Sequence, residues 1–443
     1  MLTQTVAPAF SETSAAPVVK TATPIQHVIV IIGENRTFDH VFATYVPKSG
    51  ETVDNLLSKK IIDADGKPGV NFPESYQYSA RDTASMKYRI NPPDKSLYAN
   101  LPAPLAGGPT TPYITDINVA KAVETDLPDD YYQFLISGGT GLKAHTPDTR
   151  IPNVNNLPPG PFQLTSESLP YNAYAASPVH RFYQMWQQLD CAVNHATAAN
   201  PTGCLSDLFP WVEVTVGAGS NGKPQAAGFN NQSTGEGSTA MAFYNVQKGD
   251  APYFKYLADN YAMSDNFHQS VQGGTGANHV MLGTGDAIYF SDGKGHPATP
   301  PHNELVAAGS KNAGVVDEIE NPNAQPGTNN FYTEDGYGGG SYGSPSFGGG
   351  TYSNCADTSQ PGVASVRNYL WELGVKSRCK WGGYYYLLNN YNPGYFGDGS
   401  NAFTDNNDNN TVFTIPPSSV RNIGDALLEK NVSFAYYGGD FNR

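Results

Sequence analysis

The chain has 443 residues and a formal net charge of −14, because 40 Asp and Glu stand against 26 Lys and Arg. An acidic chain without a basic run does not bind a phosphate backbone or an anionic lipid surface, which excludes nucleic acid as a partner. No apolar stretch approaches the roughly 18 residues of a transmembrane helix, and the length fits either about three domains or one α/β core with long insertions.

Residues 1–23 are rich in Thr, Ala, Pro and Val without a period, which predicts a flexible leader before a core over residues 24–443. They lack the basic start and apolar segment of a signal peptide. The charged fraction is only 15% and the chain holds 28 Tyr, a composition that favours an exported protein. We therefore expect a secreted or periplasmic protein whose signal is removed or left out of this sequence.

The first regular element is predicted at residues 27–32 (HVIVII). Such a run is typical of a strand buried on both faces in a parallel sheet. Glu34 and Asn35 follow Gly33 directly, in the usual ligand position past the carboxyl end of a strand in an open α/β sheet. A carboxylate and an amide oxygen suit a hard divalent cation. The alternative is a helix N-terminus capped by Asn35 or Thr37, with Glu34 as an exposed acid.

The later elements alternate with long irregular stretches. Insertions or caps are predicted near residues 46–160 and 290–415, which are rich in turn-forming residues, with low-complexity sequence at 325–354. Apolar spacing and capping residues predict helices at 179–190, 253–261, 361–373 and 418–430, the last capped by Ser418 or Ser419, and a short helix from Val280. Strands are predicted at 381–388 and 431–437.

A glycine-rich turn surrounds one threonine at residues 273–276 (GGTG). Glycines let backbone N–H groups approach an anion, and the Thr275 hydroxyl needs a metal or a base before it can act as a nucleophile. The alternative is an ordinary turn. Among the histidines, His180 begins a predicted helix, where the helix dipole disfavours its charged form. His40, His268 and His279 also lie near these motifs, and a single histidine is more often structural than catalytic.

The four cysteines fall into two close pairs, neither of which has the spacing of a zinc site. We predict two local disulfides, Cys191–Cys204 and Cys355–Cys379, formed in an oxidising compartment. The alternative is four buried thiols in a cytosolic protein.

Two segments carry a specific resemblance to a known family. Residues 27–42 (HVIVIIGENRTFDHVF) resemble the opening signature of the bacterial phosphoesterase family, which holds secreted acid phosphatases and phosphatidylcholine-type phospholipases C. Residues 257–278 resemble its second signature, in which a hydroxyl residue is followed three positions later by Asn. Residues 177–180 and 423–442 resemble two looser blocks, so the likeness extends over nearly the whole chain.

The resemblance implies an alkaline-phosphatase-like α/β fold, a mostly parallel sheet with helices on both faces and long irregular insertions. It implies a hydrolase acting on phosphoric ester bonds at a divalent metal, with Mg, Mn, Ca and Zn all compatible. By position, Glu34 and Asn35 match the family's metal ligands, and Thr275 matches its ligand and nucleophile. His180 matches an active-site histidine. We assign Asn278, with the backbone of Gly274 and Gly276, to binding the substrate phosphate.

Two departures from the family refine this expectation. Ala277, Asn278 and His279 replace the Pro-Asn-Arg that is usual in the phospholipases, which favours a phosphomonoesterase of the acid-phosphatase type over a phospholipase C that cleaves phosphocholine lipids. The paired-Asp motif that supplies further metal ligands does not follow Tyr437, so we expect an incomplete core with the remaining ligands beyond Arg443. The alternative of another class is a non-catalytic secreted binding or surface protein. Oligomeric state is left open.

Overall fold

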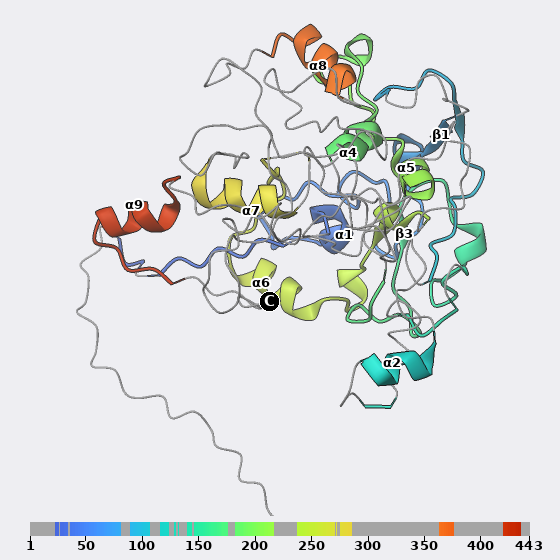
Figure 1. The fold of residues 1–443 in the computed structure, drawn as a ribbon, viewed down its shortest axis with the longest axis horizontal. Coiled ribbons are helices and arrows are strands. Elements are labelled where there is room, and N and C mark those ends of the chain that lie inside the picture. Colours follow the sequence, from blue (N-terminus) through green and yellow to red (C-terminus); the bar gives the residue numbers. More distant parts are fainter. Residues whose placement is uncertain are drawn as a thin grey trace, which may run out of the picture. The chain divides into compact units, whose positions relative to one another are not determined.

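The computed structural model describes residues 23–25, 27–33, 36–80, 89–106, 116–123, 128–129, 132, 140–143, 146–175, 182–216, 237–270, 272, 275–285, 363–375 and 420–435 (Figure 1). This part of the chain mixes helices with short strands in small sheets and contains no closed barrel, which is compatible with the α/β class. The first 34 residues form a unit of their own, and residues 35–443 form the second.

The helices and strands of the described part are short. The α-helices are α1 (Phe38–Phe42), α2 (Ile117–Val123), α4 (Phe182–Leu189), α5 (Phe209–Val216), α6 (Pro252–Asn260), α7 (Thr275–Thr284), α8 (Val363–Glu372) and α9 (Ile423–Glu429). The strands are β1 (Tyr78–Ala80), β2 (Lys95–Leu97), β3 (Phe162–Gln163) and β4 (Ala242–Phe243), and short 3-10 helices include η1 (Phe72–Ser75) and η5 (Thr239–Met241). Among the described residues, no helix has both the length and the hydropathy needed to cross a bilayer.

The strands form two pairs. β1 and β2 are antiparallel, with Tyr78 opposite Leu97, and β3 and β4 are parallel, with Phe162 opposite Ala242. The parallel pair lies in a core of buried residues from distant parts of the chain: Tyr98, Leu101, Ile151, Val154, Leu157, Phe162, Leu164, Leu169, Ala175 and Ala242. Much of the predicted insertion at 46–160 therefore packs against β3 and β4.

Helix α1 packs against β4. The backbone N–H of Tyr244 donates to the carbonyl of His40 at 2.7 Å, and Ala43 lies in one buried cluster with Phe243. A five-residue helix cannot be stable alone, because helix nucleation is unfavourable. These contacts with β4 therefore hold α1 in place.

Three predicted helices are confirmed. α4 and α8 form within the segments at 179–190 and 361–373, and α6 begins one residue before the segment at 253–261 and ends within it. Trp186 and Leu189 of α4 pack against a buried cluster that includes Cys191. Ala258 of α6 packs inward, whereas Phe254 is 47% exposed.

Three other elements differ from prediction. Residues 27–32 form no strand; Val28 and Ile29 are 79% and 85% exposed. A strand buried on both faces needs a neighbour on each side, and within the described residues no strand pairs with them. α7 begins at Thr275, earlier than Val280. α9 begins only after Asn422, whose side chain accepts hydrogen bonds from Gly424 N and Asp425 N.

Several other predicted segments lie partly or wholly outside the described residues. Residues 431–435 belong to no strand, and the rest of the strand predicted at 431–437 lies outside the described residues. The leader up to residue 22, the segment 381–388, the low-complexity stretch 325–354 and most of the insertion at 290–415 lie outside the described residues.

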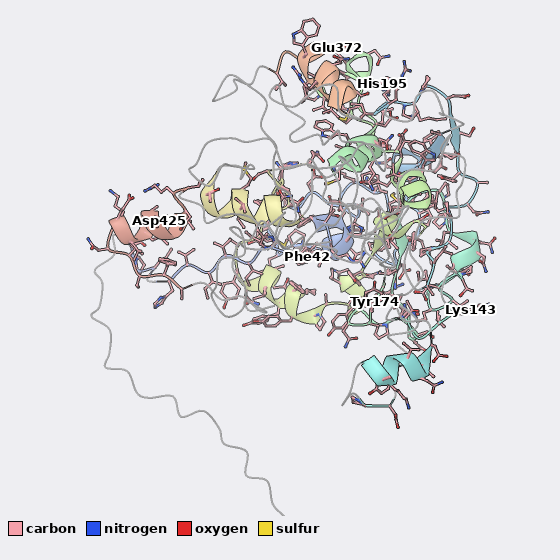
Figure 2. The ribbon with its side chains drawn as sticks, in the orientation of Figure 1. Phe42, Lys143, Tyr174, His195, Glu372 and Asp425 are labelled. Carbon is pink, nitrogen blue, oxygen red and sulfur yellow. A yellow bond between two sulfur atoms is a disulfide. The ribbon has the colours of Figure 1, made fainter. Side chains whose placement is uncertain are left out.

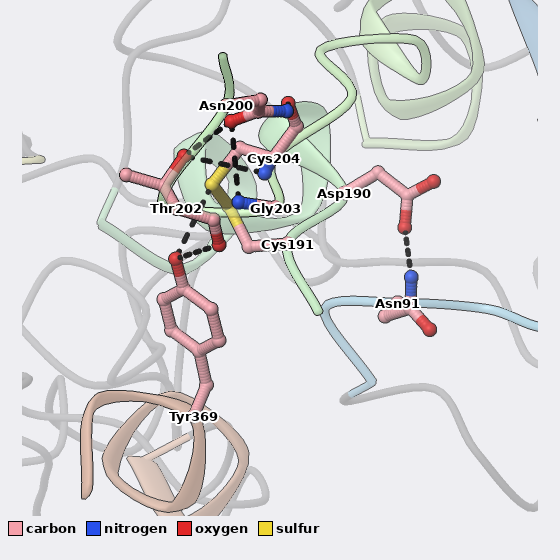
Figure 3. The surroundings of a disulfide bond; sticks show 8 residues. All are labelled: Asn91, Asp190, Cys191, Asn200, Thr202, Gly203, Cys204 and Tyr369. Carbon is pink, nitrogen blue, oxygen red and sulfur yellow. Dashed lines mark hydrogen bonds between the residues drawn. A yellow bond between two sulfur atoms is a disulfide. The ribbon is translucent and has the colours of Figure 1, made fainter. Parts of the chain in front are cut away.

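One predicted disulfide is confirmed. Cys191 and Cys204 are bonded, and Figure 3 shows them beside Tyr369 of α8. Cys355 and Cys379 lie outside the described residues, so their pairing stays a prediction.

Candidate active site

The first motif, residues 27–42, includes the capped helix α1. Thr37 is the N-cap of α1, and its side chain accepts a hydrogen bond from the backbone of His40. In return, the Thr37 N–H donates to His40 Nδ1 at 2.9 Å. The helix N-terminus that we held as an alternative is therefore present, with Thr37 as the cap. The predicted metal ligands Glu34 and Asn35, just before this cap, lie outside the described residues.

His40 is buried and neutral. Its side chain is only 6% exposed, and burial together with the charge of Arg36 lowers its pKa from 6.5 to about 3. Because Nδ1 accepts from the Thr37 N–H, we assign the proton of the neutral ring to Nε2. His40 is therefore a fixed hydrogen-bond acceptor rather than a general acid.

The end of the first motif contacts the start of the second signature. Phe42, labelled in Figure 2, and Tyr45 share an apolar cluster with Ala258 of α6 and Met263. The Tyr45 hydroxyl donates to Asp259 Oδ1 at 3.1 Å. The structure thus brings these two sequence motifs together, although more than 200 residues separate them.

The second signature ends in α7. The predicted nucleophile Thr275 is the first residue of this helix, Gly276 follows, and Asn278 is half-buried in the first turn. The side chain of Thr275 and the whole of Gly274 lie outside the described residues. The N-terminus of a helix carries partial positive charge and unsatisfied N–H groups, which favour a phosphate. α7 also contacts α9 of the fourth block.

Arg36 of the first motif contacts the chain at Ala175, which precedes residues 177–180 in the sequence. Its Nη2 donates a long hydrogen bond of 3.5 Å to the carbonyl of Ala175, five residues before His180. His180 itself lies outside the described residues, and helix α4 begins two residues after it. The described residues therefore place Ala175 beside Arg36 of the first motif.

The candidate metal ligands Glu34, Asn35 and Thr275 all offer oxygen donors. The described residues contain no cluster of three or more His, Cys, Asp or Glu that could hold a metal. The proposed set of a carboxylate, an amide oxygen and a hydroxyl consists of hard oxygen donors, which fit a divalent cation.

Sequence reasoning missed the Arg36 contact with Ala175 and the return contact from His40 to the Thr37 cap. The usual capping-box pattern has Glu or Gln three residues after the cap. Because His40 occupies that position here, the pattern did not predict the contact. The Arg36 contact joins residues 139 positions apart and leaves no local signal.

A model described as the Phosphoesterase family matches residues 152–443 of the chain. The match includes His180, Thr275 and Asn278 but begins after Glu34 and Asn35. Searches of curated proteins and of solved structures find no match.

Proposed function

Because the chain belongs to the Phosphoesterase family and is thus a hydrolase acting on phosphoric ester bonds, we propose that it is a metal-dependent phosphomonoesterase with Thr275 as its nucleophile. The observation that carries this proposal is the position of Thr275. It lies in the matched region, at the N-terminus of α7, and two glycines precede it in the sequence. A helix N-terminus stabilises both a bound phosphate and an alkoxide at that point.

Glu34, Asn35 and Thr275 would hold the metal. When bound, a divalent cation lowers the pKa of a ligated hydroxyl and neutralises phosphoryl charge. This assignment goes with the finer fold proposal, an alkaline-phosphatase-like, mostly parallel sheet with helices on both faces.

The chain's own residues then act in two steps. The Thr275 oxygen attacks phosphorus, the bond to the leaving oxygen breaks, and His180 gives that oxygen a proton. Water next attacks the phosphothreonine, phosphate leaves, and the Thr275 hydroxyl is restored. Backbone N–H groups of Gly274 and Gly276 and the amide of Asn278 donate to the phosphoryl oxygens, where charge is spread in the transition state.

The substrate class and the location have separate support. Ala277 and His279 in place of Pro and Arg favour small phosphomonoesters over phosphocholine lipids. The Cys191–Cys204 disulfide supports export to an oxidising compartment. A phospholipase C activity is the alternative that the substrate comparison below decides.

The test compares p-nitrophenyl phosphate with p-nitrophenyl phosphorylcholine, from acid to neutral pH, with divalent ions and with chelator. We expect chelator-sensitive turnover of the first substrate and a loss of about a thousandfold or more in Thr275→Ala. Thr275→Ser retains a hydroxyl and should keep part of the rate. Thr284→Ala, at the other end of α7, is the matched control and should behave like wild type.

Trapping the intermediate gives an independent readout. Acid quenching followed by peptide mass spectrometry should find phosphate on Thr275. Full activity of Thr275→Ala, or turnover that survives complete removal of metal, would contradict the proposal. Preference for the phosphorylcholine ester would assign the phospholipase C reaction instead.

A further inference from the structure

Helix α9 ends in a turn that places Asn431 in the left-handed region. The φ of Asn431 is 55°, and asparagine tolerates this conformation better than most residues that carry a side chain. Asn431 N donates to the carbonyl of Leu428, and Val432 N donates to that of Leu427, both at 2.9 Å. These two hydrogen bonds form a Schellman motif, which terminates the helix and fixes the backbone at Asn431.

The side chains at this turn face solvent. Asn431 and Ser433 are both exposed. Beyond them the chain contacts α9 again, because a Cβ added at Gly424 would come within 2.6 Å of the Phe434 ring. The turn is therefore held by α9 before and after it, while Asn431 and Ser433 stay accessible.

The sequence at this turn matches the acceptor pattern of N-linked glycosylation. Residues 431–433 (NVS) have the N-x-S form, in which a hydroxyl stands two positions after the asparagine. A Schellman motif favours an asparagine at this place but does not require Ser433. The chain's other matches to the pattern begin at Asn35, Asn231 and Asn409, which lie outside the described residues.

An acidic residue also precedes this acceptor. Glu429 lies two positions before Asn431, where bacterial oligosaccharyl transferases require a carboxylate. The corresponding residues before the other three acceptors are Gly33, Phe229 and Asn407. Glu429 forms an ion pair of 2.6 Å with Arg421, and both side chains are more than half exposed. Because an exposed pair contributes little free energy, the carboxylate can exchange Arg421 for a basic residue of a transferase.

We propose that Asn431 is an acceptor site for N-linked glycosylation after export, with a lipid-linked oligosaccharide diphosphate as the donor. Asn431 Nδ2 forms a bond to the anomeric carbon of the first sugar, and the bond from that carbon to the diphosphate oxygen breaks. The lipid diphosphate leaves, and the proton from Nδ2 passes to a base of the transferase. The Cys191–Cys204 disulfide supports the export that this reaction needs.

A glycan on Asn431 would lie beside an apolar patch. Leu428 is 62% exposed, Val432 is 46% exposed and Phe434 is 48% exposed, and each is within three residues of Asn431. Exposed apolar patches favour association between molecules. A bulky, hydrophilic glycan at their centre would oppose such association.

The test exports the chain in bacterial cells that carry an oligosaccharyl transferase and its lipid-linked donor. Peptide mass spectrometry identifies which asparagine carries the glycan. We expect the peptide that contains Asn431 to gain the mass of the donor oligosaccharide. Ser433→Ala and Glu429→Gln should abolish this gain, whereas Ser433→Thr retains the hydroxyl and should keep it.

A protein already known to be an acceptor, expressed in the same cells, is the positive control. An unmodified Asn431 beside a modified control protein would overturn the proposal, and so would modification that persists in Ser433→Ala. Glycan found only on Asn35, Asn231 or Asn409 would overturn it as well.

Thermal unfolding separates loss of the acceptor from loss of the fold. Ser433 and Glu429 are exposed, so their variants should unfold at the wild-type temperature. Asn431→Gly removes the acceptor nitrogen and keeps the turn, because glycine adopts a positive φ freely. It should therefore fold like wild type and carry no glycan.

Discussion

The phenolic hydroxyl of Tyr45 donates to Asp259 Oδ1 over 3.1 Å, joining the segment after α1 to helix α6. Lys255 Nζ donates to the other oxygen of the same carboxylate at 2.7 Å. Lys255 and Tyr45 lower the pKa of Asp259, while burial and Asp259 raise the pKa of Tyr45 to about 12. This contact joins the residues just after the first motif to the second signature.

Removing the Tyr45 hydroxyl should lower the stability of the folded protein. We expect Tyr45→Phe to lower the free energy of unfolding by about 1 kcal/mol, the usual worth of one hydrogen bond. Tyr256→Phe is the matched control on α6, because Tyr256 is 53% exposed. Urea denaturation of both variants measures the difference, and equal midpoints would show that the Asp259 contact contributes nothing.

A second cluster links β2 to the segment between α4 and α5. Lys95 Nζ hydrogen-bonds to both Asp190 and Asp207, at 2.8 Å for Asp207. Asn91 donates to Asp190 at 2.7 Å (Figure 3), and Lys95 lies over the ring of Tyr78. Burial disfavours the charge on Lys95, but its hydrogen bonds to Asp190 and Asp207 outweigh that effect and raise its pKa. The ammonium group of Lys95 thus hydrogen-bonds to two acidic side chains.

This cluster should make stability depend on pH. Burial, partly offset by Lys95, raises the pKa of Asp207 from 3.8 to about 7. Between these values the folded state holds the proton more tightly than the unfolded state, so stability falls as pH rises through this window. Asp207→Asn removes that titration. We expect the free energy of unfolding of Asp207→Asn, relative to wild type, to rise from pH 4 to pH 8.

Asp39 titrates in an overlapping range, because burial raises its pKa to about 6. It is unchanged in Asp207→Asn and therefore cancels in the comparison with wild type. Denaturant titrations at several pH values give the curve, and parallel pH profiles for the two proteins would assign the proton to another group.

The disulfide should stabilise the contact with α8. Tyr369 OH donates to the carbonyl of Thr202 at 2.9 Å and lies 3.4 Å from Cys204 Sγ, while its ring packs edge-on against Trp186 at 5.8 Å. Because the bond closes a short loop, we expect removal of both Cys191 and Cys204 to cost about 2–4 kcal/mol. Denaturation measures this loss, and hydrogen exchange over residues 363–372 should show faster opening of α8.

Tyr369→Phe distinguishes the effect of the disulfide from that of the Tyr369 hydroxyl. This variant should lose only the hydroxyl interactions, about 1 kcal/mol. Exchange in α8 that stays slow after both cysteines are replaced would mean that apolar packing alone holds the helix.

Local signals predicted what depends on neighbours in sequence. The helices α4, α6 and α8 follow from apolar spacing, because helical contacts join residues three and four apart. The Cys191–Cys204 pair and the Thr37 cap also depend on short separations. The prediction of a strand at 27–32 was wrong, because a strand needs partners elsewhere in the chain and a local pattern does not show whether they are there.

The amino-acid pattern alone predicts the family signatures, the helix-forming segments and the chemistry of the candidate site: hard oxygen ligands, a threonine among glycines, and histidine. Folding brings Arg36 to Ala175, places Lys95 between Asp190 and Asp207, and buries His40 so that it stays neutral. These features depend on burial and on contacts between distant residues. The free energy of a charge depends on the solvent and partners that folding gives it, which no local pattern encodes.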